Sequence, residues 1–111
     1  MQAVRDAISE RTKAILICTP CNPCGKVFTR EELLALGEIA CENNLYLITD
    51  EMYEYITYPG TEHVSAASLS PEIRERTITM SGFSKTYNMT GWRLGYAIAH
   101  KDIIVRWNNK K

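Results

Sequence analysis

The stretch AILICTPCNPCGKVFTREELLALGEIACENNLYLIT (residues 14–49) decides the fold. It opens with the uninterrupted apolar run AILIC (14–18) and closes with a second run, LYLIT (45–49). Apolar runs of this length are typical of strands buried on both faces, as in a parallel sheet that helices cover. We therefore predict a strand at each end of the stretch, with the first one ending before Pro20.

The segment between the two runs predicts a helix. Thr29 and Glu32 have the spacing of a capping box at a helix N-terminus. Apolar residues then recur at steps of three and four positions, at Leu33, Leu36 and Ala40. The asparagine pair at 43–44 offers a stop. A strand–helix–strand unit of this kind has a right-handed crossover, which makes its two strands parallel.

The sequence further on predicts two more strands. TITMS (77–81) is the third, and a short helix should precede it, with Ser70 as its cap and Pro71 in its first turn. LGYAIA (94–99) is the fourth. Only residues 82–93 connect it to the third, without a helical pattern. Because a parallel return needs a dozen or more residues and usually a helix, we predict an antiparallel final pair.

Together these segments indicate an α/β fold. We expect a partial, mostly parallel sheet of at least four strands, with one antiparallel strand and helices packed on its faces. Residues 51–63 are expected to form an ordered loop, and residues 1–13 the end of a helix that leads into the first strand.

Composition narrows the range of partners. The 111 residues suffice for about one small domain. Thirteen basic and thirteen acidic residues give a formal net charge of zero, so nothing indicates a nucleic-acid partner or an acidic membrane surface. No apolar run approaches the roughly 20 residues of a membrane span, and the charged N-terminus is unlike a secretory signal. We therefore expect a cytoplasmic protein.

Three of the four cysteines have a spacing that occurs in iron–sulfur proteins. Cys18, Cys21 and Cys24 form a C-x2-C-x2-C run. A ferredoxin-like pattern would place a fourth thiolate three residues after Cys24, where the sequence reads GKVFT, and Cys41 falls in the predicted helix. A metal or iron–sulfur site on the first three cysteines is therefore an alternative, and free, partly buried thiols are the default.

Polar residues gather where the predicted strands meet one edge of the sheet. Asn22 follows the first strand, Asp50 ends the second, and Tyr53 comes three residues later. Lys85 follows the third strand, and Arg93 precedes the fourth, which runs the other way and so starts from the same edge. In open α/β sheets, ligands bind at the edge formed by the carboxyl ends of the strands. We therefore predict a ligand site there.

Each of these residues also has a purely structural explanation. Asn22 could make the turn before a proline, and Asp50 could cap a short helix. Tyr53 could belong to the core, the lysine could face solvent, and Arg93 could pair with a glutamate of segment 51–54. The convergence of all five on one edge favours the ligand site over five separate explanations.

Three motifs carry a family resemblance over nearly the whole chain. NPCG (22–25) resembles the motif NPTG, with cysteine in place of threonine. TREELLALGEIACENNLYLITDEMYEY (29–55) resembles a segment that ends in a cofactor-binding aspartate and tyrosine, and GFSKTYNMTGWRLG (82–95) fits a lysine signature at some ten positions. The chain thus resembles the class I/II aminotransferases, which are fold type I enzymes dependent on pyridoxal 5′-phosphate (PLP).

The resemblance implies roles at the ring end of the cofactor. Lys85 would form an imine with the PLP aldehyde and later shuttle a proton. Asp50 would pair with the pyridinium nitrogen and so keep the ring an electron sink. Tyr53 and Asn22 would hydrogen-bond the 3-oxygen of the ring. The resemblance also suggests a cis peptide bond between Asn22 and Pro23.

At the other end, Arg93 would bind the phosphate, with help from Ser81 or Ser84. Many family members have serine three residues before the lysine, but here that residue is Gly82, so the choice between the two serines stays open.

The implied reaction is transfer of an amino group between an amino acid and a 2-oxo acid, in a homodimeric parent enzyme. A related lyase of the same fold, or an inactive α/β domain, is the remaining alternative. Residues 1–111 would be the central part of the large PLP-binding domain, truncated at both ends, because an upstream phosphate loop and a downstream substrate-binding arginine have no counterpart here. We therefore expect the isolated chain to be inactive.

Overall fold

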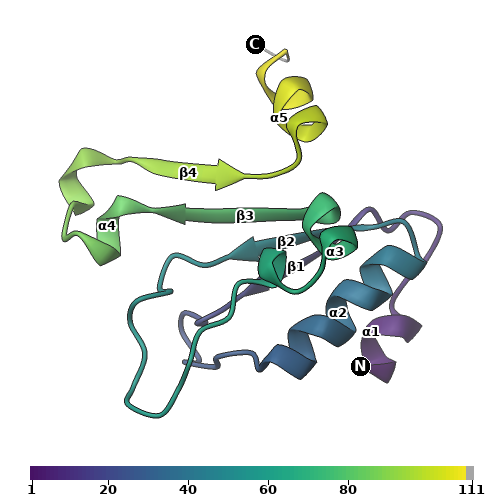
Figure 1. The fold of residues 1–111 in the computed structure, drawn as a ribbon, viewed down its shortest axis with the longest axis horizontal. Helices are drawn as coiled ribbons and strands as arrows, with labels where there is room; N and C mark the ends of the chain where they lie inside the picture. Colours follow the sequence, from purple (N-terminus) through teal and green to yellow (C-terminus); the bar gives the residue numbers. More distant parts are fainter. Residues whose placement is uncertain (110–111) are drawn as a thin grey trace.

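The structure is a computed structural model that describes residues 1–109, and its four strands form a single sheet in the order β1-β2-β3-β4 (Figure 1). The strands are β1 (Ala14–Cys18), β2 (Tyr46–Asp50), β3 (Thr77–Gly82) and β4 (Gly95–Ile98). β1, β2 and β3 are parallel to one another, and β4 is antiparallel to β3. The predicted α/β fold and the predicted direction of every strand are confirmed.

Seven helical segments precede, connect or follow the strands in the described residues. They are α1 (Gln2–Asp6), α2 (Arg30–Glu42), η1 (Ala66–Ser68), α3 (Pro71–Arg76), α4 (Phe83–Thr86), η2 (Thr90–Trp92) and α5 (Lys101–Asn108). None of the helices in this part of the chain has the length and apolar character that a membrane span requires.

The predicted caps explain where two of the helices begin. The hydroxyl of Thr29 accepts a hydrogen bond from the Glu32 N–H at 3.2 Å, and the Glu32 carboxylate accepts one from the Thr29 N–H at 2.9 Å. This is the capping box that the sequence predicts. At α3, the Ser70 hydroxyl accepts from the Ile73 N–H at 3.2 Å, and Pro71 occupies the first turn.

The connection between β3 and β4 differs from the prediction. Residues 82–93 were expected to lack a helix, but they contain the single turn α4 and the 3-10 turn η2. A turn of three or four residues is too short to show a helical period in the sequence. Arg93 then takes a left-handed conformation with φ = 53° and turns the chain into β4.

The helices α2 and α3 and the 3-10 turn η1 pack against one face of the sheet (Figure 1). Leu47 of β2 belongs to the buried core, and Ile15 and Ile17 of β1 pack against it from the same face. The helical segments contribute Leu33, Ala40, Ala66 and Ile73 to this core. Leu16 points the other way and is 67% exposed. In the described residues β1 is therefore buried on one face only, whereas its uninterrupted apolar run predicted burial on both.

Candidate active site

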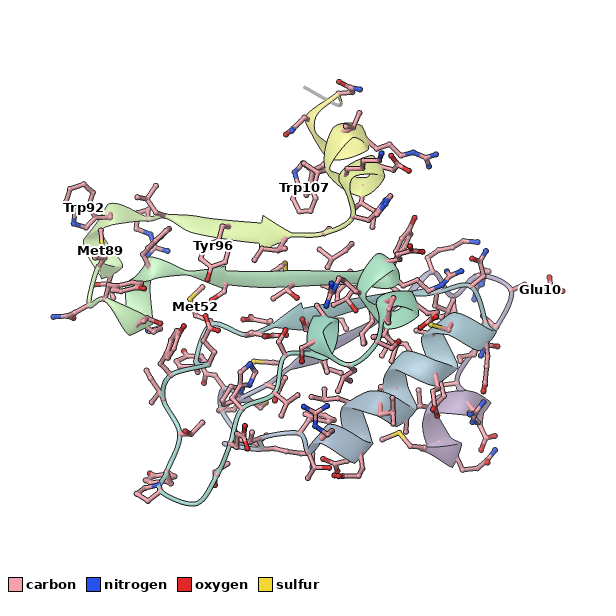
Figure 2. All side chains as sticks on the ribbon, in the orientation of Figure 1. Glu10, Met52, Met89, Trp92, Tyr96 and Trp107 are labelled. Carbon is pink, nitrogen blue, oxygen red and sulfur yellow. The ribbon has the colours of Figure 1, made fainter. Side chains whose placement is uncertain are left out.

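The candidate site lies at the edge where β1, β2 and β3 end and β4 begins. Cys18, Asp50 and Met80 are neighbours across the three parallel strands, and Gly82 of β3 pairs with Gly95 of β4. The segments that carry the predicted site residues follow or precede these positions. Met89 and Trp92, in the connection from α4 to β4, lie at the same end of the sheet (Figure 2).

Three of the predicted residues come together from three different segments. The side-chain amide of Asn22 donates a hydrogen bond to the Tyr53 hydroxyl at 3.1 Å. The Lys85 amine lies 5.7 Å from the centre of the Tyr53 ring. Tyr53 is half-buried, whereas Asn22 and Lys85 are exposed. An amide, a phenol and an amine thus share one accessible location.

The backbone at Asn22 has the predicted geometry. The Asn22–Pro23 peptide bond is cis, as expected from the resemblance. The Thr19–Pro20 bond is also cis, which the sequence analysis did not foresee. The Gly25 N–H donates to the Cys21 carbonyl at 2.8 Å, so Asn22 also lies in a tight turn.

Asp50 ends β2 with its side chain half-buried. One carboxylate oxygen accepts a hydrogen bond from the Met52 N–H at 3.1 Å. This hydrogen bond two residues along the chain is the kind of contact that the structural explanation above describes, in which Asp50 acts as a cap. It also fixes the orientation of the carboxylate at the strand end.

Arg93 does not pair with either nearby glutamate in the described residues. Its guanidinium donates to the Thr90 carbonyl at 2.8 Å, and its side chain is exposed. The ion pair with Glu51 or Glu54, considered above as the structural alternative for Arg93, is therefore absent from the described residues. The left-handed backbone of Arg93 and its hydrogen bond to Thr90 of η2 hold the guanidinium beside this turn.

The two candidate serines lie in different surroundings. Ser81 is buried, and its hydroxyl contacts the Glu54 carboxylate at 3.2 Å and the Glu51 carbonyl at 3.5 Å. Ser84 is half-buried in α4, directly before Lys85. The hydroxyl of Ser81 is thus already engaged within the protein.

Gly82 has a steric reason to be glycine. A Cβ at this position would lie 2.9 Å from the Met52 side chain and 3.0 Å from the Leu94 carbonyl oxygen. The close approach of these groups leaves no space for a side chain, which accounts for glycine three residues before Lys85.

The cysteines are free thiols. Cys18, Cys21 and Cys41 are half-buried, and Cys24 is exposed. The backbone N–H of Lys26 and the thiol of Cys21 lower the pKa of Cys24, while the contact with Cys24 raises the pKa of Cys21. Among the described residues, the side chains grouped closely enough to hold a metal ion are Glu51, Glu54 and His63, without any cysteine. The cysteine-based metal site is therefore not favoured.

Sequence reasoning missed a buried polar cluster beside the site. Glu51, which follows Asp50, is 1% exposed and accepts hydrogen bonds from Thr49 and Ser65. His63 faces its second oxygen. A glutamate directly after a buried strand was the available signal, but its partners lie in a loop that has no periodic pattern.

The comparisons with known proteins decide the family. A family model described as aminotransferase class I and II matches residues 1–110. The chain belongs to the class I and II aminotransferases. The aspartate aminotransferase of Bacillus subtilis (strain 168) is 47% identical over 108 residues, which are 97% of this chain and 28% of that protein.

Solved structures of proteins described as aminotransferases agree with the sequence match. An aromatic aminotransferase from Pyrococcus horikoshii OT3 superposes with a TM-score of 0.90 at 43% identity, covering 95% of this chain and 28% of that one. A PLP-bound protein from Clostridium difficile 630 gives a TM-score of 0.79 at 33% identity, covering 85% and 24%. The chain thus spans about a quarter of the length of the proteins it matches.

Proposed function

We propose that the protein acts as a PLP-dependent aminotransferase, which transfers an amino group between an amino acid and a 2-oxo acid. Family membership and relatives named aspartate aminotransferase support this proposal. The observation that carries it is the position of the Lys85 amine, which lies 5.7 Å from the centre of the Tyr53 ring. The hydroxyl of the same tyrosine accepts a hydrogen bond from Asn22.

The residues at the ring end fit PLP chemically. When bound, PLP supplies an aldehyde and an electron-withdrawing ring. Lys85 offers the amine that would bind the aldehyde, and the same nitrogen can then hold and move a proton. Asp50 offers a fixed carboxylate for a protonated ring nitrogen. Tyr53 and Asn22 offer hydrogen-bond donors for an anionic ring oxygen.

At the phosphate end, we assign Arg93 together with Ser84. A guanidinium suits a phosphate dianion because it presents several donors in a planar fork. Ser84 is the better candidate of the two serines, since Ser81 already contacts Glu54 and the carbonyl of Glu51.

The wider context of the enzyme is also proposed. Residues 1–111 would form the central part of a large PLP-binding domain, in a homodimeric parent. The four free cysteines are consistent with a reducing compartment such as the cytoplasm. The related-lyase alternative has no specific observation in its favour.

Borohydride reduction in the presence of PLP, followed by peptide mapping, tests the central assignment. The cofactor label should appear on Lys85, and Lys85→Ala should lose it while the fold is retained. The other lysines serve as controls and should stay unlabelled, in particular Lys13, Lys26 and Lys101. Label on one of these lysines in place of Lys85 would overturn the assignment.

A further inference from the structure

A buried carboxylate anchors the loop that carries Tyr53. Glu51 is 1% exposed, and one of its oxygens accepts hydrogen bonds from the Thr49 hydroxyl at 2.8 Å and the Ser65 hydroxyl at 3.1 Å. Its other oxygen lies 3.0 Å from Nε2 of His63. A carboxylate oxygen accepts, so Nε2 donates in this contact in the His63 tautomer that carries its hydrogen there. Glu51 therefore joins the end of β2 to residues 12 and 14 positions further along the chain.

A second carboxylate holds the other end of the same turn. The Glu54 N–H donates to the Glu51 carbonyl at 3.0 Å. The Glu54 carboxylate accepts from Ser81 of β3 at 3.2 Å and lies 3.5 Å from the hydroxyl of Tyr96 of β4. Tyr53 lies between these two anchored residues, so its backbone is fixed to the sheet from both sides.

The same cluster raises the question of a metal ion. Ligand atoms of Glu51, Glu54 and His63 lie within 4.8 Å of one another. Nδ1 of His63 is buried and has no hydrogen-bond partner among the described residues. However, both oxygens of Glu51 already receive hydrogen bonds, three in all, at 2.8–3.1 Å. A cation would have to displace them, so the hydrogen-bonded cluster is the better reading of this geometry.

We propose that Glu51 is a positioning residue, which acts through His63, Ser65 and the turn 51–54 to hold the phenol of Tyr53 against Asn22 and Lys85. Its importance for the reaction rests on the aminotransferase function proposed above. Glu51 itself would touch neither substrate nor cofactor. Without it, three donors lose their acceptor, and the start of the turn is released from the residues that follow the loop.

The position of Tyr53 can be measured without any cofactor. The chain is labelled with ¹³Cζ-tyrosine, and the NMR signal of Tyr53 is identified among the six tyrosines by Tyr53→Phe. Asn22→Ala gives the signal of a Tyr53 that has lost its partner. Glu51→Met should move the signal at least half of the way to that position. Glu51→Gln, which keeps one acceptor oxygen, should move it less.

The matched control is Glu62→Met, which makes the same substitution at an exposed glutamate of the same loop. It should leave the signal within its linewidth. If circular dichroism shows that Glu51→Met does not fold, Ser65→Ala decides, because it removes one donor to Glu51 and should shift the signal in the same direction. A variant at position 51 that folds and keeps the wild-type Tyr53 signal would overturn the proposal. If Glu51→Met does not fold, a wild-type Tyr53 signal in Ser65→Ala would overturn it.

A measurement with PLP tests whether the anchoring of Tyr53 matters for the reaction. With PLP present, the pH midpoint of the absorbance of the Lys85 adduct should shift in Glu51→Met in the direction seen in Tyr53→Phe. Failure of wild type to form an adduct would count against the proposed function, while the NMR signal still decides the anchoring. An unmoved midpoint beside a moved NMR signal would overturn the link to the reaction.

Calorimetric titration with Zn²⁺ or Mn²⁺ tests the metal alternative. No binding supports the hydrogen-bonded cluster. One equivalent bound with micromolar affinity and lost in His63→Gln would overturn it in favour of a metal site.

Discussion

Replacing Gly37 with alanine should destabilise the protein, although alanine is normally favoured in a helix. Gly37 is buried within α2, and a Cβ there would lie 2.5 Å from Cδ1 and 2.8 Å from Cγ1 of Ile73. Ordinary contacts between carbon atoms are about 3.5–4.0 Å. Ile73 is 3% exposed, so its side chain lies within a packed environment and must push its neighbours to make room.

Two effects of opposite sign set the magnitude. Alanine gains about 1 kcal/mol over glycine inside a helix, and overpacking a core costs about 1–3 kcal/mol. We expect a net loss of about 1 kcal/mol in the free energy of unfolding. For a domain of this size that corresponds to a fall of roughly 4 °C in Tm.

A double-mutant cycle isolates the contact. In an Ile73→Ala background the methyl and methylene groups that crowd the new Cβ are gone. The same Gly37→Ala substitution should then stabilise by about 1 kcal/mol, which makes the coupling energy about 2 kcal/mol. Urea unfolding followed by circular dichroism measures all four free energies. A higher unfolding free energy for Gly37→Ala alone would refute the reasoning, because it would mean that Ile73 moves aside at no cost.

Other predictions concern the site and the helix cap. Asp50→Ala should lower the turnover of the active enzyme by about 10²–10³-fold, because a fixed charge at the ring nitrogen is lost, and should affect cofactor binding less. Steady-state turnover within threefold of wild type would show that Asp50 is a local cap only. Cys24 should react with iodoacetamide at lower pH than Cys21, because its pKa is lowered and thiolate is the reactive form. Cys21→Ala removes a donor to Cys24, so the pH dependence of the Cys24 alkylation rate should move to higher pH. Mass-spectrometric mapping that finds this pH dependence unchanged would exclude the thiol–thiol contact. Thr29→Ala should lower the unfolding free energy by about 1 kcal/mol through loss of the capping box, and no change in thermal unfolding would show that water replaces the cap.

The sequence predicts the elements whose signals are local. The capping box at Thr29 and the cap at Ser70 depend on residues three positions apart, and both are present in the structure. The antiparallel β4 follows from the short connection before it. The exposed face at Leu16 could not be predicted, because an apolar run says nothing about which of its faces a helix covers.

The candidate site was predictable in part for the same reason. Strand direction is enough to bring Asn22, Asp50 and Lys85 to one edge, since the carboxyl ends of parallel strands meet there. The hydrogen bond between Asn22 and Tyr53 agrees with their predicted common location. The anchoring by Glu51 and His63 was not predictable, because these residues meet across a loop whose path no periodicity encodes.

The order of the strands in the sheet is also the order in which they are synthesised. Each strand pairs with the strand that precedes it in the chain, from Ala14 with Tyr46, through Leu47 with Thr77, to Thr79 with Ile98. When the chain emerges from a ribosome, N-terminus first, β2, β3 and β4 each therefore find one pairing partner already made. Among these four described strands none lies between two earlier ones, so each can add to the edge left by the strand before it, and the loops that close are short compared with those of sheets in which distant strands pair.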